Sequence, residues 1–180
     1  ERLSLEVRAI PKATGTAAIL VTHDQHEAFV VADRIGIMHA GRIEQWDTPY
    51  NLYHRPATRH VADFVGQGVF LPGRVLDRES VAIELGTLKS RVPLECGSSR
   101  DVCGKGCTLV ILLRPDDILH DDAAPARAEV VAKAFRGAEC LYTLKLASGA
   151  QVLSLVPSHH NHAIGEQIGI RLDVDHVVAF

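Results

Sequence analysis

This chain of 180 residues has few aromatic residues and only a small net charge. Phe, Trp and Tyr make up 5% of it, and 19 Lys and Arg stand against 22 Asp and Glu, for a net charge of −3. Proteins that bind single-stranded nucleic acid need stacking aromatics, and nucleic-acid binders usually carry a basic patch. The composition therefore argues against a nucleic-acid partner.

The chain also lacks a long apolar run, an initiator Met and a signal peptide. No run approaches the roughly 18 residues that a membrane-spanning helix needs, and no segment has the pattern of a secretory leader. The chain opens on Glu1-Arg2-Leu3, inside a segment that we expect to be helical. We therefore expect a piece of a longer protein, with enough apolar residues for one or two folded units.

Cysteine is sparse, with four residues in all: Cys96, Cys103, Cys107 and Cys140. Cys103 and Cys107 have a spacing that zinc sites use, but the other two do not form the second pair that a structural zinc site needs. We expect four free thiols, as is usual for a cytosolic protein, and no metal site.

Residues 16–47 carry the most informative pattern. The apolar residues 17–21 predict a strand buried on both faces of a parallel sheet. Thr22-His23-Asp24 follows, and Asp24 is a candidate N-cap, with Glu27 as its capping-box partner, for a helix over residues 25–32. This order places His23 at the carboxyl edge of a sheet, where open α/β sheets hold ligands. No glycine-rich phosphate-binding loop accompanies it.

The rest of the first 65 residues reads as mixed α/β. Apolar spacing predicts a helix over residues 1–13. Residues 34–39 and 42–46 predict a hairpin that turns at Ala40-Gly41. Two further helices are expected, over residues 49–54 and 57–65, the first of them capped by the sequence Asp47-Thr48-Pro49.

From Gly66 onward, short apolar segments alternate with Gly, Pro and Asp, which predicts an all-β region with strands about ten residues apart. A polar connection over residues 116–125 would divide this region into two small barrels. The strands are expected within residues 70–76, 80–85, 89–93, 108–114, 126–135, 139–146, 151–156, 167–172 and 176–180.

Four motifs resemble one family. They are Val21-Thr22-His23-Asp24-Gln25-His26-Glu27-Ala28, Ala32-Asp33-Arg34-Ile35, Gly41-Arg42-Ile43, and Thr48-Pro49 with Leu52-Tyr53. Together they resemble the part of ABC transporter ATP-binding subunits that follows the Walker B motif. Leu113-Arg114-Pro115-Asp116-Asp117-Ile118 is similar to the segment that opens the second barrel of the TOBE regulatory domain in importers of this kind. The resemblance covers nearly the whole chain.

The resemblance implies a fold and an activity. Residues 1–65 would be the α/β remnant of a P-loop nucleotide-binding domain, and residues 66–180 an all-β, OB-like TOBE regulatory domain. His23 would be the switch histidine that contacts the γ-phosphate of ATP. The full-length parent would then be an ATPase that uses ATP and Mg²⁺. This chain lacks the Walker A, signature and Walker B motifs, so alone we expect it to be inactive and to hold no cofactor.

The resemblance also implies partners. The parent would be peripheral to the cytoplasmic face of the inner membrane, would work with membrane permease subunits and a periplasmic binding protein, and would form a homodimer. Within the family, Phe135-Arg136-Gly137, Leu141-Tyr142-Thr143-Leu144, Pro157-Ser158-His159-His160 with His162, and the residues from Leu172 to Val178 resemble iron(III)-import ATPases.

Two other groups of residues invite a functional interpretation. His159-His160-Asn161-His162 could hold a metal, but a loop or turn role is favoured, since ferric iron prefers oxygen ligands. A second group could form an oxyanion site or simply a solvated basic face: Lys89, Arg91, Lys133, Arg136 and Lys145. The alternative to the transporter is a stand-alone sensor module, not an enzyme, that binds a small oxyanion or metabolite.

Overall fold

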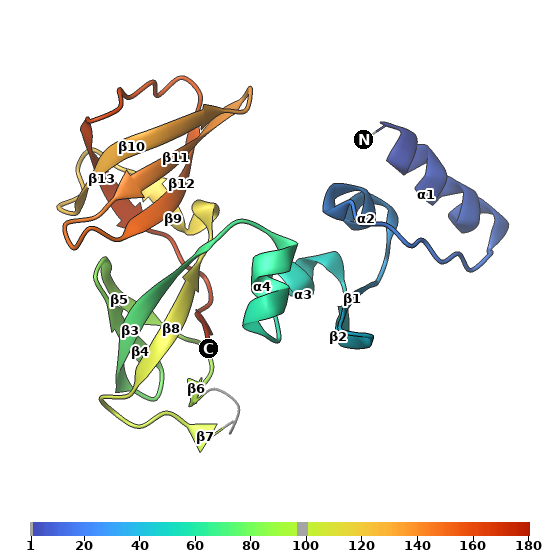
Figure 1. Ribbon diagram of the computed structural model, residues 1–180, viewed down its shortest axis with the longest axis horizontal. Helices are drawn as coiled ribbons and strands as arrows, with labels where there is room; N and C mark the ends of the chain where they lie inside the picture. The colour runs from blue at the N-terminus through green and yellow to red at the C-terminus, as the bar shows by residue number, and fades with distance from the viewer. Residues whose placement is uncertain (1, 97–100) are drawn as a thin grey trace. The chain divides into compact units, whose positions relative to one another are not determined.

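A computed structural model describes residues 2–96 and 101–180. The chain divides into two compact units, with the division between Gly66 and Gln67 (Figure 1). The first unit is mixed α/β and the second is built from strands, so the predicted fold class, an α/β part followed by an all-β part, is confirmed.

The first unit begins with two helices, α1 (Arg2–Thr14) and α2 (Gln25–Val31), that pack against each other. Arg8 donates a 2.7 Å hydrogen bond to the carbonyl of Val31, and Arg8 and Lys12 both pair with Asp33 at 2.6 Å. The bond from Lys12 is the main reason that the pKa of Asp33 is lowered. Polar contacts of this kind join the helices, because α1 has no buried residue.

None of the helices in the described part of the chain has both the length and the hydropathy to span a membrane.

The strand predicted over residues 17–21 does not form. The segment is irregular, and the side chains of Ile19 and Val21 are 95% and 92% exposed. A strand of a parallel sheet needs neighbours to satisfy its backbone N–H and C=O groups and to cover its side chains. The described residues provide no strand that pairs with this segment, so the apolar run stays in contact with water.

The remainder of the first unit follows the predicted order. Strands β1 (Ile35–His39) and β2 (Arg42–Asp47) form an antiparallel hairpin whose turn has positive φ at Ala40 and Gly41. Helices α3 (Pro49–His54) and α4 (Arg59–Val65) begin at Thr48 and Thr58, whose side chains accept hydrogen bonds from backbone N–H groups three residues on. Helix α4 therefore begins two residues later than expected. The small core of this unit consists of Ile37, Leu52, Val61 and Val65.

The second unit contains two five-stranded antiparallel sheets (Figure 1). One has the order β12-β11-β10-β13-β9, with β9 (Ile118–His120), β10 (Arg127–Phe135), β11 (Glu139–Lys145), β12 (Gln151–Pro157) and β13 (Gln167–Leu172). The other has the order β14-β8-β3-β4-β5, with β3 (Val69–Asp77), β4 (Ser80–Ile83), β5 (Gly86–Lys89), β8 (Thr108–Leu113) and β14 (Val178–Ala179). A small hairpin pairs β6 (Glu95–Cys96) with β7 (Asp101–Val102).

The first of these sheets is barrel-like, because its outer strands β12 and β9 also lie against each other. Buried and less buried residues alternate along β12 and the first half of β10, so one face of each points to the core, whereas β11 buries Cys140, Leu141 and Tyr142 in succession. A single apolar cluster runs through both sheets, and Tyr142 is the largest of its fully buried side chains. We ascribe most of the stability of this unit to that cluster.

Three expectations for the second unit need correction. The strand predicted over residues 89–93 does not form beyond Lys89; the strand found here is β5, which pairs with β4 in a tight hairpin. The connection over residues 116–125 is not only a linker, since it contains the end of a 3-10 helix (Pro115–Asp117) and β9. β9 forms there because it pairs with β13.

The thiols are the third correction. Cys107 and Cys140 are free, as expected, whereas Cys103 is disulfide-bonded. Cys103 follows β7, and its backbone N–H donates to the carbonyl of Leu94 at 2.8 Å. The side chain of Cys96 lies outside the described residues.

Gly169 on β13 gives a test of how closely the second unit is packed. A Cβ at this position would lie 2.1 Å from the carbonyl oxygen of Asp121, so the backbone would have to move. We expect Gly169→Ala to lower the free energy of unfolding by about 2 kcal/mol, the usual size of an overpacking penalty. Gly104→Ala is the matched control, because a Cβ there meets nothing within 4 Å. Equal urea-unfolding midpoints for the two variants would show that the backbone at Gly169 has room for a Cβ, which contradicts the close contact with Asp121.

Candidate functional site

His23, the predicted catalytic residue, lies in an exposed bend just before α2. The expected support for it, a strand over residues 17–21, is missing from the structure. The bend itself is well ordered by side chains: the Thr22 hydroxyl donates to Glu27 at 2.8 Å and accepts from the Asp24 backbone N–H at 3.0 Å. The imidazole of His23 is thus presented to solvent from a defined turn.

Asp24 is the N-cap of α2, as predicted. Its carboxylate accepts a 3.0 Å hydrogen bond from the backbone N–H of Glu27, and this bond is the main cause of the lowered pKa of Asp24. The predicted capping box is only half formed, because the side chain of Glu27 accepts from Thr22 instead of from the backbone of Asp24. These residues therefore act locally, to begin the helix beside His23.

A hollow lies between α1 and α2. Its lining consists of Ser4, Asp24, His26, Glu27, Phe29 and Val30. His23 is not among these residues. The hollow carries no Lys or Arg but has the carboxylates of Asp24 and Glu27, so its charge does not favour phosphate. The residues present thus do not form a nucleotide site by themselves.

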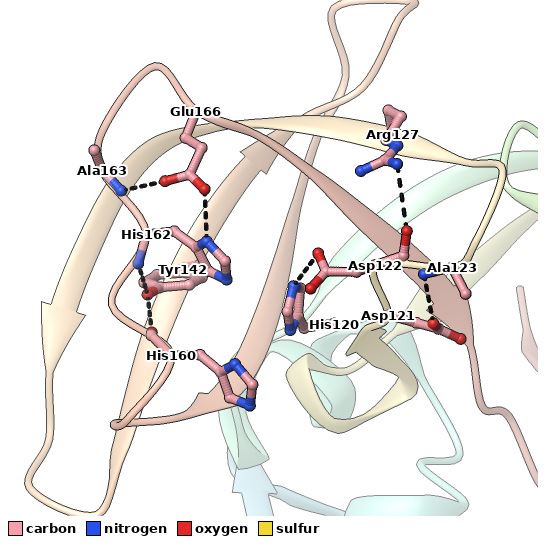
Figure 2. A network of polar contacts seen from close by, with 10 residues as sticks. All are labelled: His120, Asp121, Asp122, Ala123, Arg127, Tyr142, His160, His162, Ala163 and Glu166. Atoms are coloured by element: carbon pink, nitrogen blue, oxygen red, sulfur yellow. Dashed lines mark hydrogen bonds and ion pairs between the residues drawn. The ribbon is translucent and has the colours of Figure 1, made fainter.

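The most organised polar cluster is in the second unit. The sequence pattern pointed to His160 and His162 but not to their partner, His120. His120, at the end of β9, meets His160 and His162 from the loop between β12 and β13 (Figure 2). Each of the three histidines offers one ring nitrogen, and these three nitrogens all lie within 4.8 Å of one another. The strand pairing of His120 with Ile170 brings it there, across 40 residues of sequence.

Neighbouring groups fix this histidine cluster, which we define as His120, His160 and His162. His162 Nδ1 lies 2.8 Å from a carboxylate oxygen of Glu166, and His120 Nε2 lies 3.0 Å from Asp122 (Figure 2). The buried Tyr142 hydroxyl donates to the carbonyl of His160 at 2.6 Å and accepts from the N–H of His162 at 3.1 Å. The side chains of His120 and His162 are only 8% and 15% exposed.

The basic residues proposed as an oxyanion site are not brought together by any contact of the structure. Arg91 pairs with Asp175 at 3.7 Å. Lys133 donates to the side chain of Asn161 and to the carbonyl of His162, and Arg136 donates to the side chain of Gln67 at 2.8 Å. Lys89 and Lys145 lie on strands β5 and β11, in different sheets. The solvated basic face is therefore the better description.

Asp117 is the one described acid whose pKa is strongly raised. It follows Arg114 and Pro115 in the short 3-10 helix, and its side chain accepts a 2.7 Å hydrogen bond from the backbone N–H of Arg114. Burial raises the pKa of Asp117 to about 6, with a smaller contribution from the charge of Asp116, while Arg114 and His176 act in the opposite direction. The segment joins β8 to β9, and so lies between the two sheets.

Among known families, the TOBE domain matches residues 111–180. Several curated relatives are similar over most of this chain. The spermidine/putrescine import ATP-binding protein PotA of Methylococcus capsulatus is 34% identical over 83% of this chain and 40% of its own length. The putrescine transport ATP-binding protein PotG of Escherichia coli is 30% identical over 92% of this chain and 45% of its own.

A third relative carries a different substrate in its name. The Fe(3+) ions import ATP-binding protein FbpC of Streptomyces avermitilis is 34% identical over 99% of this chain and 49% of its own length. The chain thus spans less than half the length of these curated relatives. Among solved structures, the cytoplasmic molybdate-binding protein ModG aligns with a TM-score of 0.48 and 15% identity over 62% of this chain and 94% of its own.

The raised pKa of Asp117 predicts a pH-dependent stability. Between the usual pKa of an Asp, near 4, and about 6, the folded state binds more protons here than the unfolded state. The contribution of Asp117 to the free energy of unfolding therefore falls as pH rises through this window, by roughly 2–3 kcal/mol in total. Above the window this contribution is constant. Asp117→Asn keeps the acceptor for Arg114 and removes the titration. We expect the stability difference between Asp117→Asn and wild type to grow from pH 4 to pH 6.5 in chemical unfolding; a pH-independent difference would contradict it.

Proposed function

This chain corresponds to the C-terminal region of ABC transporter ATP-binding subunits with a TOBE domain, and we propose that it is the C-terminal part of the ATP-hydrolysing subunit of an importer. The observation that carries the proposal is a match of 30–34% identity to such subunits over most of the chain. The proposed domains are residues 1–65, the end of the nucleotide-binding domain, and residues 66–180, the regulatory domain.

The exposed apolar surface of the first unit supports this assignment. Ile19 and Val21 lie open to water, and so do Leu3, Leu5 and Ile10 on α1. Exposed apolar patches of this kind mark surfaces that another polypeptide covers. The strands and helices of a nucleotide-binding domain would provide that cover, and residues 17–21 would then take the strand conformation that their composition favours.

In the complete subunit, the proposed role of His23 is to contact the γ-phosphate of ATP. ATP and Mg²⁺ would be held mainly by other parts of the subunit, because the described residues beside His23 do not form a phosphate-binding site. Phosphoryl transfer depends on positioning and on electrostatic stabilisation. A His at the N-terminal end of α2, oriented by the Thr22–Glu27 bend, is suited to supply both.

The partners proposed for the complete subunit are membrane permease subunits and a periplasmic binding protein, with the subunit as a homodimer at the cytoplasmic face of the inner membrane. For the cargo we propose iron(III), as the motifs near Arg136 and His160 suggest. The similarity to FbpC over 99% of the chain supports it. The relatives PotA and PotG are named for polyamines, so spermidine and putrescine are the competing cargoes.

The ATPase proposal can be tested in a chimera that joins this chain to the N-terminal part of E. coli PotG. We expect the chimera to hydrolyse ATP, and His23→Ala to lower kcat by about 100-fold or more, the usual effect of losing one group that stabilises the transition state. ATP binding, measured by equilibrium titration, should change little. The measurement is phosphate release at saturating ATP.

His26→Ala is the matched control, because His26 is exposed and lies in the first turn of α2, three residues after His23. It should hydrolyse ATP at the rate of the unmodified chimera. A His23→Ala chimera with unimpaired turnover would rule out the proposed role of this residue.

The cargo can be tested by uptake. The genes next to the one for this chain would first be searched for a permease and a binding protein. Cells that lack their own iron(III) and polyamine importers would then receive these two proteins together with the chimera. We expect accumulation of labelled iron(III) and not of labelled spermidine, since the binding protein sets the choice of cargo. Uptake of spermidine alone would replace iron(III) by a polyamine and leave the ATPase proposal intact.

A further inference from the structure

We propose that the histidine cluster binds a divalent transition-metal ion, with His120, His160 and His162 as ligands, and that Zn²⁺ is the ion it fits best. Three imidazoles that leave further positions open form a donor set that suits Zn²⁺, Ni²⁺ and Cu²⁺. The site lies wholly within the second unit and does not depend on the proposed ATPase.

The spacing of the ligand atoms is close to what a metal requires. Ring nitrogens of the three histidines lie within 4.8 Å of one another. Zn–N bonds of about 2.0–2.1 Å in tetrahedral geometry would place them about 3.3 Å apart. Binding therefore needs the rings to move inward by roughly 1 Å, which rotation of the His160 and His162 side chains in their loop can provide.

His162 provides the strongest single argument. Its Nδ1 lies 2.8 Å from the carboxylate of Glu166, which holds the proton of the neutral ring on Nδ1 and leaves the Nε2 lone pair free. Within the described part of the chain, this Nε2 is buried and has no hydrogen-bond partner. A buried polar atom without a partner costs free energy, and a metal ion would satisfy it.

The groups around the cluster have the arrangement of an outer metal shell. Metal-binding histidines commonly donate their second ring N–H to a carboxylate, which fixes the tautomer and makes the ligand more basic. Glu166 does this for His162, and is itself held by the backbone N–H of Ala163 at 2.7 Å. Asp122 stands beside His120 Nε2 and adds a second negative charge (Figure 2).

The backbone of the loop is positioned before any ion binds. Tyr142 is fully buried in the core of the sheet, and its hydroxyl joins the backbone of His160 to that of His162. The site therefore does not need to order a free loop, which would reduce affinity.

The groups that face the cluster are of both signs: Asp122 and Glu166 are acidic, and Lys133 binds the carbonyl of His162 on the other side of the loop. The two carboxylates lie nearest to the ring nitrogens.

A second group with ligand-like spacing, His39, Glu44 and His60, lies in the first unit. It lacks the features that carry the proposal, because His39 is exposed and no buried ring nitrogen of this group is left without a partner among the described residues. It matters for the experiment, since it could compete for metal.

The test is a competition titration of Zn²⁺ into this chain at pH 7.5 against a chromophoric chelator. His39→Ala serves as the background, which removes the second group. We expect one ion per chain, and a loss of affinity of more than about 100-fold in each of the variants His120→Ala and His162→Ala. Glu166→Gln should lose about 10- to 100-fold, the usual cost of removing an outer-shell carboxylate.

His159→Ala is the matched control, since His159 neighbours His160 in sequence but is not one of the three ligands. It should bind Zn²⁺ as the background chain does. Circular dichroism checks that every variant folds, and the visible spectrum of the Co²⁺ complex reports directly on nitrogen ligands.

Three outcomes would overturn the proposal. One is no Zn²⁺ binding tighter than the millimolar range. Another is affinity that survives in both His120→Ala and His162→Ala. The third is equal loss in His159→Ala, which would show that a histidine-rich loop binds metal without a defined site.

Discussion

The buried hydroxyl of Tyr142 holds together the most organised part of this molecule. Its ring fills the centre of the apolar cluster, and its oxygen reaches the backbone of the loop after β12. A buried hydroxyl must find partners, and here the partners are the two residues on either side of Asn161. Because one side chain serves both the core and the loop, the packing of the sheet determines where His160 and His162 lie.

The two units differ in how much of their own apolar surface they bury. In the second unit, two sheets share one apolar core. The first unit has a small core of four residues and leaves the apolar face of α1 and residues 17–21 exposed. Its helices are joined by Arg8, Lys12 and Asp33 through contacts that are partly exposed, and such contacts contribute little stability. Stability should therefore differ between the two units.

Local signals in the sequence were sufficient for most elements. Asp24, Thr48 and Thr58 begin helices through their own side chains, and Ala40-Gly41 makes the turn of a hairpin. These features depend on residues a few positions apart. The strand over residues 17–21 failed for the opposite reason, because strands depend on neighbours that sequence pattern does not reveal. β9 was missed in the same way, since pairing with β13 creates it.

The candidate sites follow the same division. His23 was predicted from a contiguous motif, and the described residues beside it do not form a phosphate-binding site. The histidine cluster lies wholly within the described residues, and two of its three histidines, His160 and His162, were visible in sequence as part of the run from His159 to His162. The sequence did not reveal His120, because it lies 40 positions before His160 and no local pattern links residues that far apart. Strand register alone brings it to the loop, and Glu166 then sets which nitrogen of His162 faces it. A site of this kind depends on tertiary structure, so its chemistry can be examined in this chain independently of nucleotide and membrane partners.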